Sequence, residues 1–261
     1  MDLRDRHVVV TGAARGIGAA LARRFHTDGA RVVVADVLDV DDTVSALPGS
    51  VGVIADVSTE AGNVALIEAA EAAFGPVDLF FANAGIGGGT TLDTPEAEWE
   101  RAFAINVHAH RWAAKHLVPG WVARGEGYFC STASAAGVLA QIGSAPYTMT
   151  KRAAVAFAEW LAITYGDAGI RVSCLCPQGV NTEMLRSGDG LGGGTDVVRA
   201  AGVVLEPDDV AQIVADAISA ERFLILPHPE VQDYMIRKAT DPDRWLGGMR
   251  KLQRRIADAL S

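Results

Sequence analysis

Short apolar, β-branched runs alternate with helix-like segments along most of this chain. The runs are residues 7–11, 31–36, 51–56, 78–84, 127–134, 171–176 and 223–226. Apolar runs of this length are typical of strands buried on both faces, and strands that are separated by helices pair in parallel. The alternation therefore predicts an α/β fold, in which a doubly wound parallel sheet of about seven strands carries helices on both faces.

Composition favours one domain and narrows the partners. The 261 residues are 49% hydrophobic, and no Pro/Ser-rich linker divides them, so residues 1–261 are expected to form a single domain. A net charge of -9 disfavours nucleic acid and anionic membranes as main partners. No apolar run reaches the ~20 residues of a membrane span, and the N-terminus lacks the apolar centre of a signal peptide. We expect a cytoplasmic protein. Residues 228–261 are expected to form a basic, helical tail that helps to close a pocket or an oligomer interface.

The first predicted strand leads directly into a glycine-rich turn, TGAARGIG, and then into a helix. The N–H groups and the dipole at a helix N-terminus attract a phosphate, and glycines let the backbone approach it closely. The glycine spacing differs from the common GxGxxG pattern, and a tight turn without a ligand is the alternative. We predict a dinucleotide phosphate site made by Gly12, Arg15, Gly16, Ile17 and Gly18.

Acidic residues end the second and third predicted strands. Asp36 lies at the distance from the turn that is expected of a residue that bonds an adenosine ribose. Its charge would repel a 2′-phosphate, which favours NAD over NADP, whereas Arg15 could attract that phosphate. An ordinary strand-ending acid or helix cap is the alternative for Asp36. Asp56 and Val57 are expected to contact the adenine.

The fourth predicted strand runs into the glycine-rich stretch NAGIGGG. Small residues after a strand allow a ring or a ribose to lie against the backbone, although a plain turn would look the same. Asn83, Ala84 and Gly85 are therefore predicted to bind the cofactor.

A serine, a tyrosine and a lysine carry the predicted chemistry. Tyr147 and Lys151 are four residues apart on a predicted helix, so they project from nearly the same face. A neighbouring ammonium favours the phenolate and should lower the pKa of the tyrosine, which suits proton exchange with an alcohol. Ser134 ends the fifth predicted strand, and ligands of open parallel sheets bind at the carboxyl ends of the strands. Ser134 lies thirteen residues before Tyr147.

A polar residue within a predicted apolar helix, residues 95–124, adds a further candidate. Asn106 must have its amide satisfied, either by a neighbouring strand or by a polar site. The helix that carries Tyr147 is apolar on more than one face, which predicts a subunit contact, with full burial as the alternative.

No metal site is expected. Cys174 and Cys176 lie within a predicted strand, and we expect their side chains to point to opposite faces. The histidines at 108, 110 and 116 lie on a helix without a matching carboxylate pattern. Three cysteines fit buried thiols better than a disulfide framework.

Taken in order, these motifs resemble the short-chain dehydrogenase/reductase family of the classical, single-domain type, with its Rossmann-like sheet. The resemblance includes TGAARGIG, Asp56, the NAG at residues 83–85, Asn106, Ser134 and Tyr147-x-x-x-Lys151, and it ends with residues 177–182. It implies a nicotinamide-dependent oxidoreductase that interconverts an alcohol and a ketone, usually as a homotetramer. A homodimer is the alternative.

The resemblance also implies a role for each site residue. Tyr147 would be the general base for oxidation and the acid for reduction. Lys151 would bind the nicotinamide ribose and lower the tyrosine pKa, together with the positive nicotinamide ring. Ser134 would bond the substrate oxygen, and its thirteen-residue spacing to Tyr147 favours it over Ser131 for this role. Asn106 would hold a water of a proton relay.

The segment after the sixth strand would complete the cofactor site. Thr182 would bond the nicotinamide carboxamide, and Val180 would pack beside it, with Pro177 and Gly179 in the same segment. The family usually has Pro-Gly at this point, whereas this chain reads Pro177-Gln178-Gly179.

The residues that flank the catalytic elements are mostly apolar, which favours a hydrophobic secondary alcohol or ketone as substrate. They are Leu139, Gln141, Ile142, Met184 and Leu185. The glycine-rich residues 186–202 are expected to be a lid, with plain disorder as the alternative. Competing hypotheses are an NADP-dependent carbonyl reductase, a nicotinamide-binding sensor and an epimerase or dehydratase of the extended type, for which the C-terminal segment is too short.

Overall fold

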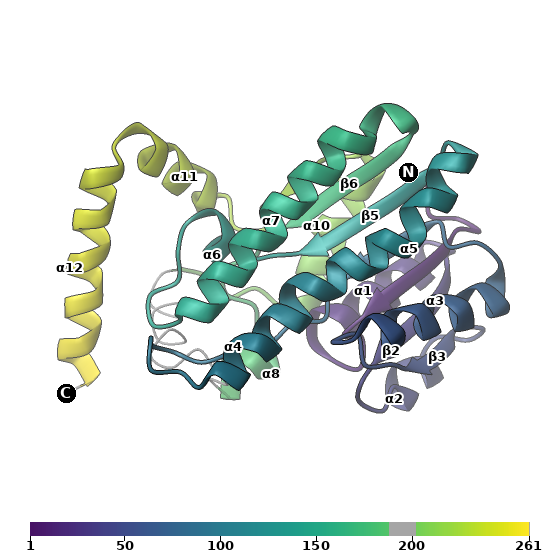
Figure 1. Cartoon of the computed structure of the whole chain (residues 1–261), viewed down its shortest axis with the longest axis horizontal. Coiled ribbons are helices and arrows are strands. Elements are labelled where there is room, and N and C mark those ends of the chain that lie inside the picture. Colours follow the sequence, from purple (N-terminus) through teal and green to yellow (C-terminus); the bar gives the residue numbers. More distant parts are fainter. Residues whose placement is uncertain (188–201, 261) are drawn as a thin grey trace.

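Seven parallel strands form one sheet, in the order β3-β2-β1-β4-β5-β6-β7, in the computed structural model of this chain (Figure 1). The structure describes residues 1–187 and 202–260. The strands are β1 (His7–Thr11), β2 (Arg31–Asp36), β3 (Val51–Ile54), β4 (Leu79–Ala82), β5 (Gly127–Thr132), β6 (Ile170–Leu175) and β7 (Leu224–Ile225). The strand order reverses between β1 and β4, so the carboxyl ends of these strands flank a crevice. The predicted doubly wound sheet is confirmed.

Helices cover both faces of the sheet. They are α1 (Gly16–Thr27), α2 (Asp41–Ser45), α3 (Glu60–Phe74), α4 (Glu96–Phe103), α5 (Ala109–Arg124), α6 (Ala135–Val138), α7 (Ala145–Tyr165), α8 (Glu183–Ser187), α10 (Pro207–Ser219), α11 (Glu230–Thr240) and α12 (Pro242–Leu260). Helices α3, α5 and α7 lie on one face, and α1 and α10 lie on the other (Figure 1). No helix in the described ranges is both long and apolar enough to cross a membrane.

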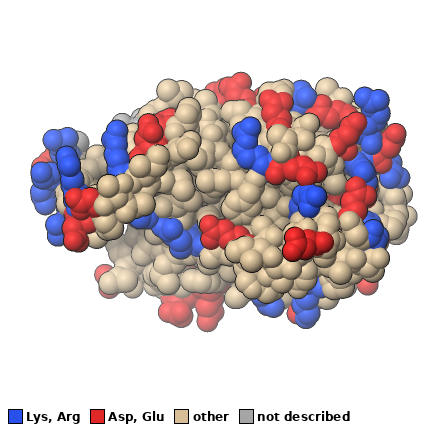
Figure 2. Space-filling model, turned by 90° about the horizontal axis from the view of Figure 1, so that it is seen from above, with Lys and Arg blue, Asp and Glu red and all other residues tan. Residues whose placement is uncertain are grey.

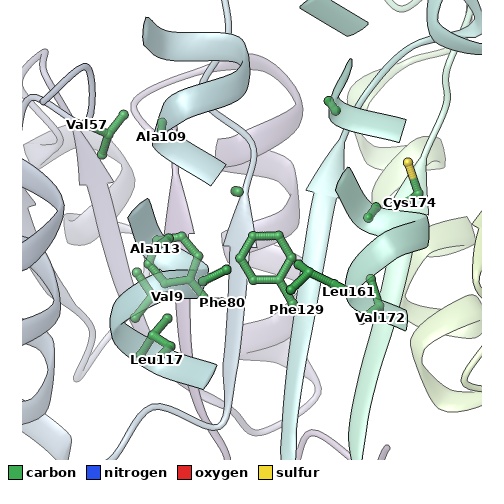
Figure 3. Close-up of a cluster of buried hydrophobic side chains, with 14 of the residues drawn as sticks. Val9, Val57, Phe80, Ala109, Ala113, Leu117, Phe129, Leu161, Val172 and Cys174 are labelled. Atoms are coloured by element: carbon green, nitrogen blue, oxygen red, sulfur yellow. The ribbon is translucent and has the colours of Figure 1, made fainter. Parts of the chain in front are cut away.

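The core on the α3/α5/α7 face is built by alternate residues of neighbouring strands. Val9, Phe80 and Phe129 project from β1, β4 and β5 toward this face (Figure 3). The rings of Phe80 and Phe129 stack with their centroids 6.3 Å apart. Leu117 of α5 and Leu161 of α7 cover them (Figure 3). The intervening residues of the same strands fill a second cluster under α1 and α10. Two buried faces explain why these strands are continuous apolar runs.

Several strands end earlier than predicted, and in two of them a polar side chain bonds the backbone that follows. β3 ends at Ile54, and the Asp56 carboxylate accepts the N–H of Ser58 at 2.9 Å. β5 ends at Thr132, and Ser134 caps α6 by accepting the N–H of Ala136 at 3.1 Å. Such local side-chain bonds compete with the strand ladder.

The prediction that Cys174 and Cys176 point to opposite faces was wrong, whereas the prediction of buried thiols is confirmed. Cys174 and Cys176 project from the same face of the chain, and their sulfur atoms lie 3.9 Å apart, because side chains alternate with a period of two residues along a strand. Cys130 is a third buried free thiol. The described residues contain no group of three or more His, Cys, Asp or Glu side chains that could hold a metal ion.

Candidate active site

A cavity of about 440 Å³ lies at the carboxyl ends of the strands. It brings together most of the predicted site residues: Gly12, Arg15, Gly16, Ile17, Gly18, Asp36, Asp56, Val57, Asn83, Ala84, Gly85, Ser134, Gln141, Tyr147, Lys151, Pro177, Val180, Thr182, Met184 and Leu185. Of the other predicted residues, Asn106, Leu139, Ile142 and Gly179 are outside the described lining.

The glycine turn between β1 and α1 brings bare backbone to the cavity. Gly12 has a φ of 64°, and a Cβ on it would lie 2.8 Å from the Cα of Ala84. A Cβ on Gly18 would lie 2.1 Å from the carbonyl oxygen of Gly12. Arg15, the N-cap residue of α1, makes no side-chain hydrogen bond to the first turn of the helix. The uncapped N–H groups and the absent side chains fit a phosphate group.

Asp36 stands beside this turn at the end of β2. One carboxylate oxygen accepts the N–H of Ala14 at 3.0 Å, and the other accepts the N–H of Leu38 at 3.0 Å. The carboxylate is therefore fixed against the glycine turn, on the wall of the cavity. Each carboxylate oxygen can accept more than one hydrogen bond, so capacity for a ribose hydroxyl remains.

Asn83 joins three strand ends. Its amide nitrogen donates to the carbonyl oxygens of Thr11 (3.0 Å) and Gly12 (3.3 Å). Its amide oxygen accepts the hydroxyl of Thr132 at 3.0 Å. In the described structure this side chain therefore links the glycine turn, β4 and β5. The prediction gave Asn83 a role in cofactor binding and did not include this structural role.

Ser134, Tyr147 and Lys151 meet on the opposite side of the cavity. The Lys151 ammonium lies 5.6 Å from the centroid of the Tyr147 ring and donates to the carbonyl oxygen of Thr132 at 2.9 Å. A hydrogen bond joins Tyr147 to Ser134. A hydroxyl, a phenol and an ammonium therefore lie close together in the lining of the cavity.

Burial controls the pKa values of this group. Desolvation raises the pKa of Tyr147, against the lowering effect of the Ser134 hydrogen bond. Burial also lowers the pKa of Lys151 to about 8, although the neighbouring Cys174 and Cys176 favour its charged form. The predicted lowering of the tyrosine pKa is therefore wrong for the chain by itself, because desolvation penalises the phenolate.

Asn106 lies behind Lys151, in a π-helical turn (Ala104–His108) that joins α4 to α5. Its amide exchanges two hydrogen bonds of 2.9 Å with the backbone of Ile86 and donates to the Thr150 hydroxyl at 3.0 Å. A Cβ on Gly85 would lie 3.1 Å from the Lys151 nitrogen and 3.2 Å from the Asn106 amide oxygen. Gly85 thus leaves room for the lysine, and the π turn, a feature frequent at functional sites, directs Asn106 inward.

Comparison with known proteins identifies the family of this chain. The sequence profile described as "short chain dehydrogenase" matches residues 6–189. The chain belongs to the short-chain dehydrogenase family. It is 34% identical over 246 residues to 1-deoxy-11-beta-hydroxypentalenate dehydrogenase of Streptomyces exfoliatus, with coverage of 89% of this chain and 86% of that protein. It is also 34% identical over 223 residues to (+)-borneol dehydrogenase 1 of Salvia officinalis, with coverage of 80% and 85%.

A solved structure shows the same fold. The short-chain dehydrogenase/reductase of Burkholderia phymatum in complex with NAD superposes on this chain with a TM-score of 0.85 and 29% sequence identity. The match covers 93% of this chain and 96% of the other.

In this short-chain dehydrogenase, the residues predicted to contact a substrate lie on the loop after α6 and on α8. The Gln141 N–H donates to the Thr148 hydroxyl at 2.9 Å, which ties the loop to α7 one residue after Tyr147. Met184 and Leu185 reach the cavity from α8. Of the predicted lid, Arg186 lies at the end of α8, and residues 188–201 lie outside the described residues.

The sequence analysis did not identify His228. Its side chain bonds the backbone at Gln178, where the chain departs from the family's usual Pro-Gly. The Nδ1 atom of His228 accepts the N–H of Gln178 at 3.1 Å, so its proton is on Nε2. Nε2 faces the carbonyl oxygens of Gly179 (3.1 Å) and Val203 (3.2 Å). Gln178 lines the cavity, and its amide oxygen is buried without a partner within the described residues. Only the departure at Gln178 could have drawn attention to this region in the sequence.

Proposed function

We propose that this short-chain dehydrogenase interconverts a hydrophobic secondary alcohol and its ketone by hydride transfer with NAD. The observation that carries the proposal is the meeting of Ser134, Tyr147 and Lys151 in the cavity that also contains the glycine turn. Such a group suits proton exchange with an alcohol oxygen. The names of two relatives, a borneol dehydrogenase and a hydroxypentalenate dehydrogenase, support an alcohol as substrate.

In this mechanism the chain's own residues handle the proton. Tyr147 removes the alcohol proton in oxidation and returns it in reduction. Ser134 bonds the substrate oxygen and stabilises the charge that develops on it. Lys151 stabilises the phenolate form of Tyr147 and binds the ribose next to the nicotinamide. A bound nicotinamide would supply the hydride acceptor or donor.

The glycine turn and Asp36 support a dinucleotide on the other side of the cavity. The uncapped N-terminus of α1 would hold the pyrophosphate, and Asp36 would accept the ribose hydroxyls. A 2′-phosphate at that point would be repelled by the carboxylate, which favours NAD. Arg15 also lines the cavity, and its charge supports the alternative, an NADP-dependent carbonyl reductase. The proposed set is completed by the adenine contacts Asp56 and Val57 and by the segment 177–182.

The substrate side supports an apolar alcohol. Met184, Leu185 and Ile105 line the cavity, and Gln141 is a polar group among them. Apolar walls with a few polar groups are usual for sites that hold a small organic ligand. Leu139 and Ile142 belong to the loop next to this wall, where a substrate larger than a single ring would extend.

An oligomer is also proposed, as a homodimer or a homotetramer. Trp160 and Ile163 on α7 are 52% and 83% exposed. The Trp160 ring stacks on Phe157, with centroids 6.3 Å apart, and meets Tyr165 edge to face. Exposed aromatic and aliphatic side chains on one helix are typical of a subunit contact.

The experiment is absorbance at the reduced-nicotinamide band, with purified protein, a panel of cyclic, aryl and terpenoid secondary alcohols, and either NAD or NADP. We expect turnover with NAD at least tenfold above NADP in kcat/KM, which corresponds to ~1.4 kcal/mol. Faster turnover with NADP would favour the carbonyl reductase.

Tyr147→Phe provides the matched test of the proton donor, because it removes one oxygen atom. Turnover should be abolished, while NADH affinity, measured by fluorescence, stays within about threefold. NADH binding with no turnover of any alcohol by the wild type would favour a sensor. Loss of NADH binding in the variant would contradict the role assigned to Tyr147.

A further inference from the structure

Helix α12 is amphipathic and basic. Its apolar side chains Trp245, Met249, Leu252 and Ile256 recur at intervals of four, three and four residues, which places them in one stripe. All four are half-buried, whereas the residues between them are mostly exposed. Residues 242–261 contain five Lys or Arg and two Asp, so the acidic excess of the chain lies outside this segment.

The start of the C-terminal arm, defined as α11 and α12, is fastened to the body. Val231 of α11 is fully buried, and Met235 packs against the core under α7. The Lys238 ammonium donates to the carbonyl oxygens of Val138 (3.0 Å) and Leu139 (2.5 Å) at the end of α6. The arm therefore leaves the body in a defined direction, beside the loop that borders the substrate side of the cavity.

Helix α12 itself stands to one side of the body (Figure 1). Among the described helices and strands, it packs closely only on α11, where the rings of Tyr234 and Trp245 are 6.1 Å apart. Ile236 on α11 and Leu246 on α12 are each 57% exposed. An apolar stripe on a helix that stands off its own body requires a partner to bury it.

Charge indicates which partner fits. Lys and Arg side chains gather at the end of the molecule that α12 occupies (Figure 2), whereas the whole chain carries a net charge of -9. Outside residues 242–261 the chain has 18 Lys or Arg (23 less 5) and 30 Asp or Glu (32 less 2), so a second copy offers an acidic body to this basic helix. An anionic membrane would attract α12 but repel the acidic remainder.

We infer that α12 packs against a second copy of this chain, with its apolar stripe at the contact and its basic residues facing the acidic surface of that copy. The contact is separate from the exposed face of α7, because it involves different elements. Since the arm starts beside the loop after α6, assembly through α12 would stabilise the border of the substrate side.

The mass of the full-length protein in solution, measured by light scattering after size exclusion, tests this inference. The wild type should be an oligomer. Leu252→Glu places a charge in the stripe, and the mass should fall about twofold, as expected when one two-fold contact is lost. Gln253→Glu adds the same charge on the exposed side of α12 and should leave the mass unchanged. Circular dichroism confirms that the variants are folded, and Met249→Glu replaces Leu252→Glu if that variant does not fold.

A monomeric wild type would overturn the inference, as would a Leu252→Glu variant with the wild-type mass. A monomer that binds phosphatidylglycerol vesicles, and loses this binding in Leu252→Glu, would assign α12 to a membrane surface instead. None of these measurements depends on catalytic activity, so their failure is distinct from failure of the proposed reaction.

Discussion

Replacing Lys151 with methionine tests how the active site holds a buried ammonium group. Burial lowers the pKa of Lys151 from 10.5 to about 8. The unfolded chain therefore binds more protons than the folded chain between these pH values, and stability increases with pH across the interval. Below the pKa of Lys151 in the folded chain, burial of its charge lowers the free energy of unfolding by about 3 kcal/mol. This loss falls to about 1 kcal/mol near pH 9.5.

Methionine has a similar length and no charge, so Lys151→Met removes this dependence. The free energy of unfolding, from urea titrations without added nucleotide, would be compared in wild type and variant from neutral pH to about pH 9.5. The variant should be more stable than the wild type at neutral pH, and this difference in the free energy of unfolding should shrink by about 2 kcal/mol by about pH 9.5. It shrinks because the buried lysine of the wild type loses its charge over this range.

Lys115→Met is the matched control. Lys115 is 55% exposed and pairs with Glu60 on the surface, so its removal should leave the pH dependence of stability unchanged. Parallel stability curves for wild type and Lys151→Met would refute the argument that burial controls this pKa.

Three further variants test the cofactor and substrate sides. Asp36→Asn should reduce the kcat/KM preference for NAD over NADP about tenfold. An unchanged ratio would show that this acid does not select the cofactor and would favour the alternative, an ordinary strand-ending acid. Gly18→Ala places a Cβ 2.1 Å from the Gly12 carbonyl oxygen and should lower the free energy of unfolding by roughly 2 kcal/mol, whereas Gly120→Ala, with nothing within 4 Å, should not lower it. Lys238→Met frees the carbonyl groups at the end of α6 and should raise KM for the alcohol with NAD affinity unchanged, while Lys238→Arg should keep most of the wild-type KM.

The sequence by itself determined the order of elements and the place of the chemistry. Continuous apolar runs predicted strands buried on both faces, and the helices between them predicted parallel pairing. The segment TGAARGIG predicted a turn into α1, and the four-residue spacing of Tyr147 and Lys151 placed both on one helix face. These signals are local, because each depends on residues close together along the chain and on the periods of helix and strand.

Only the tertiary structure decided the properties that depend on distant neighbours. Asn83 bonds Thr11, Gly12 and Thr132 because three strands end at the same edge, which no local pattern reveals. The pKa of Tyr147 is raised rather than lowered because desolvation, a property of the folded surroundings, outweighs the hydrogen bond from Ser134. His228 holds the backbone at Gln178 across fifty residues of chain for the same reason: burial and long-range contacts exist only once the sheet and its helices have packed.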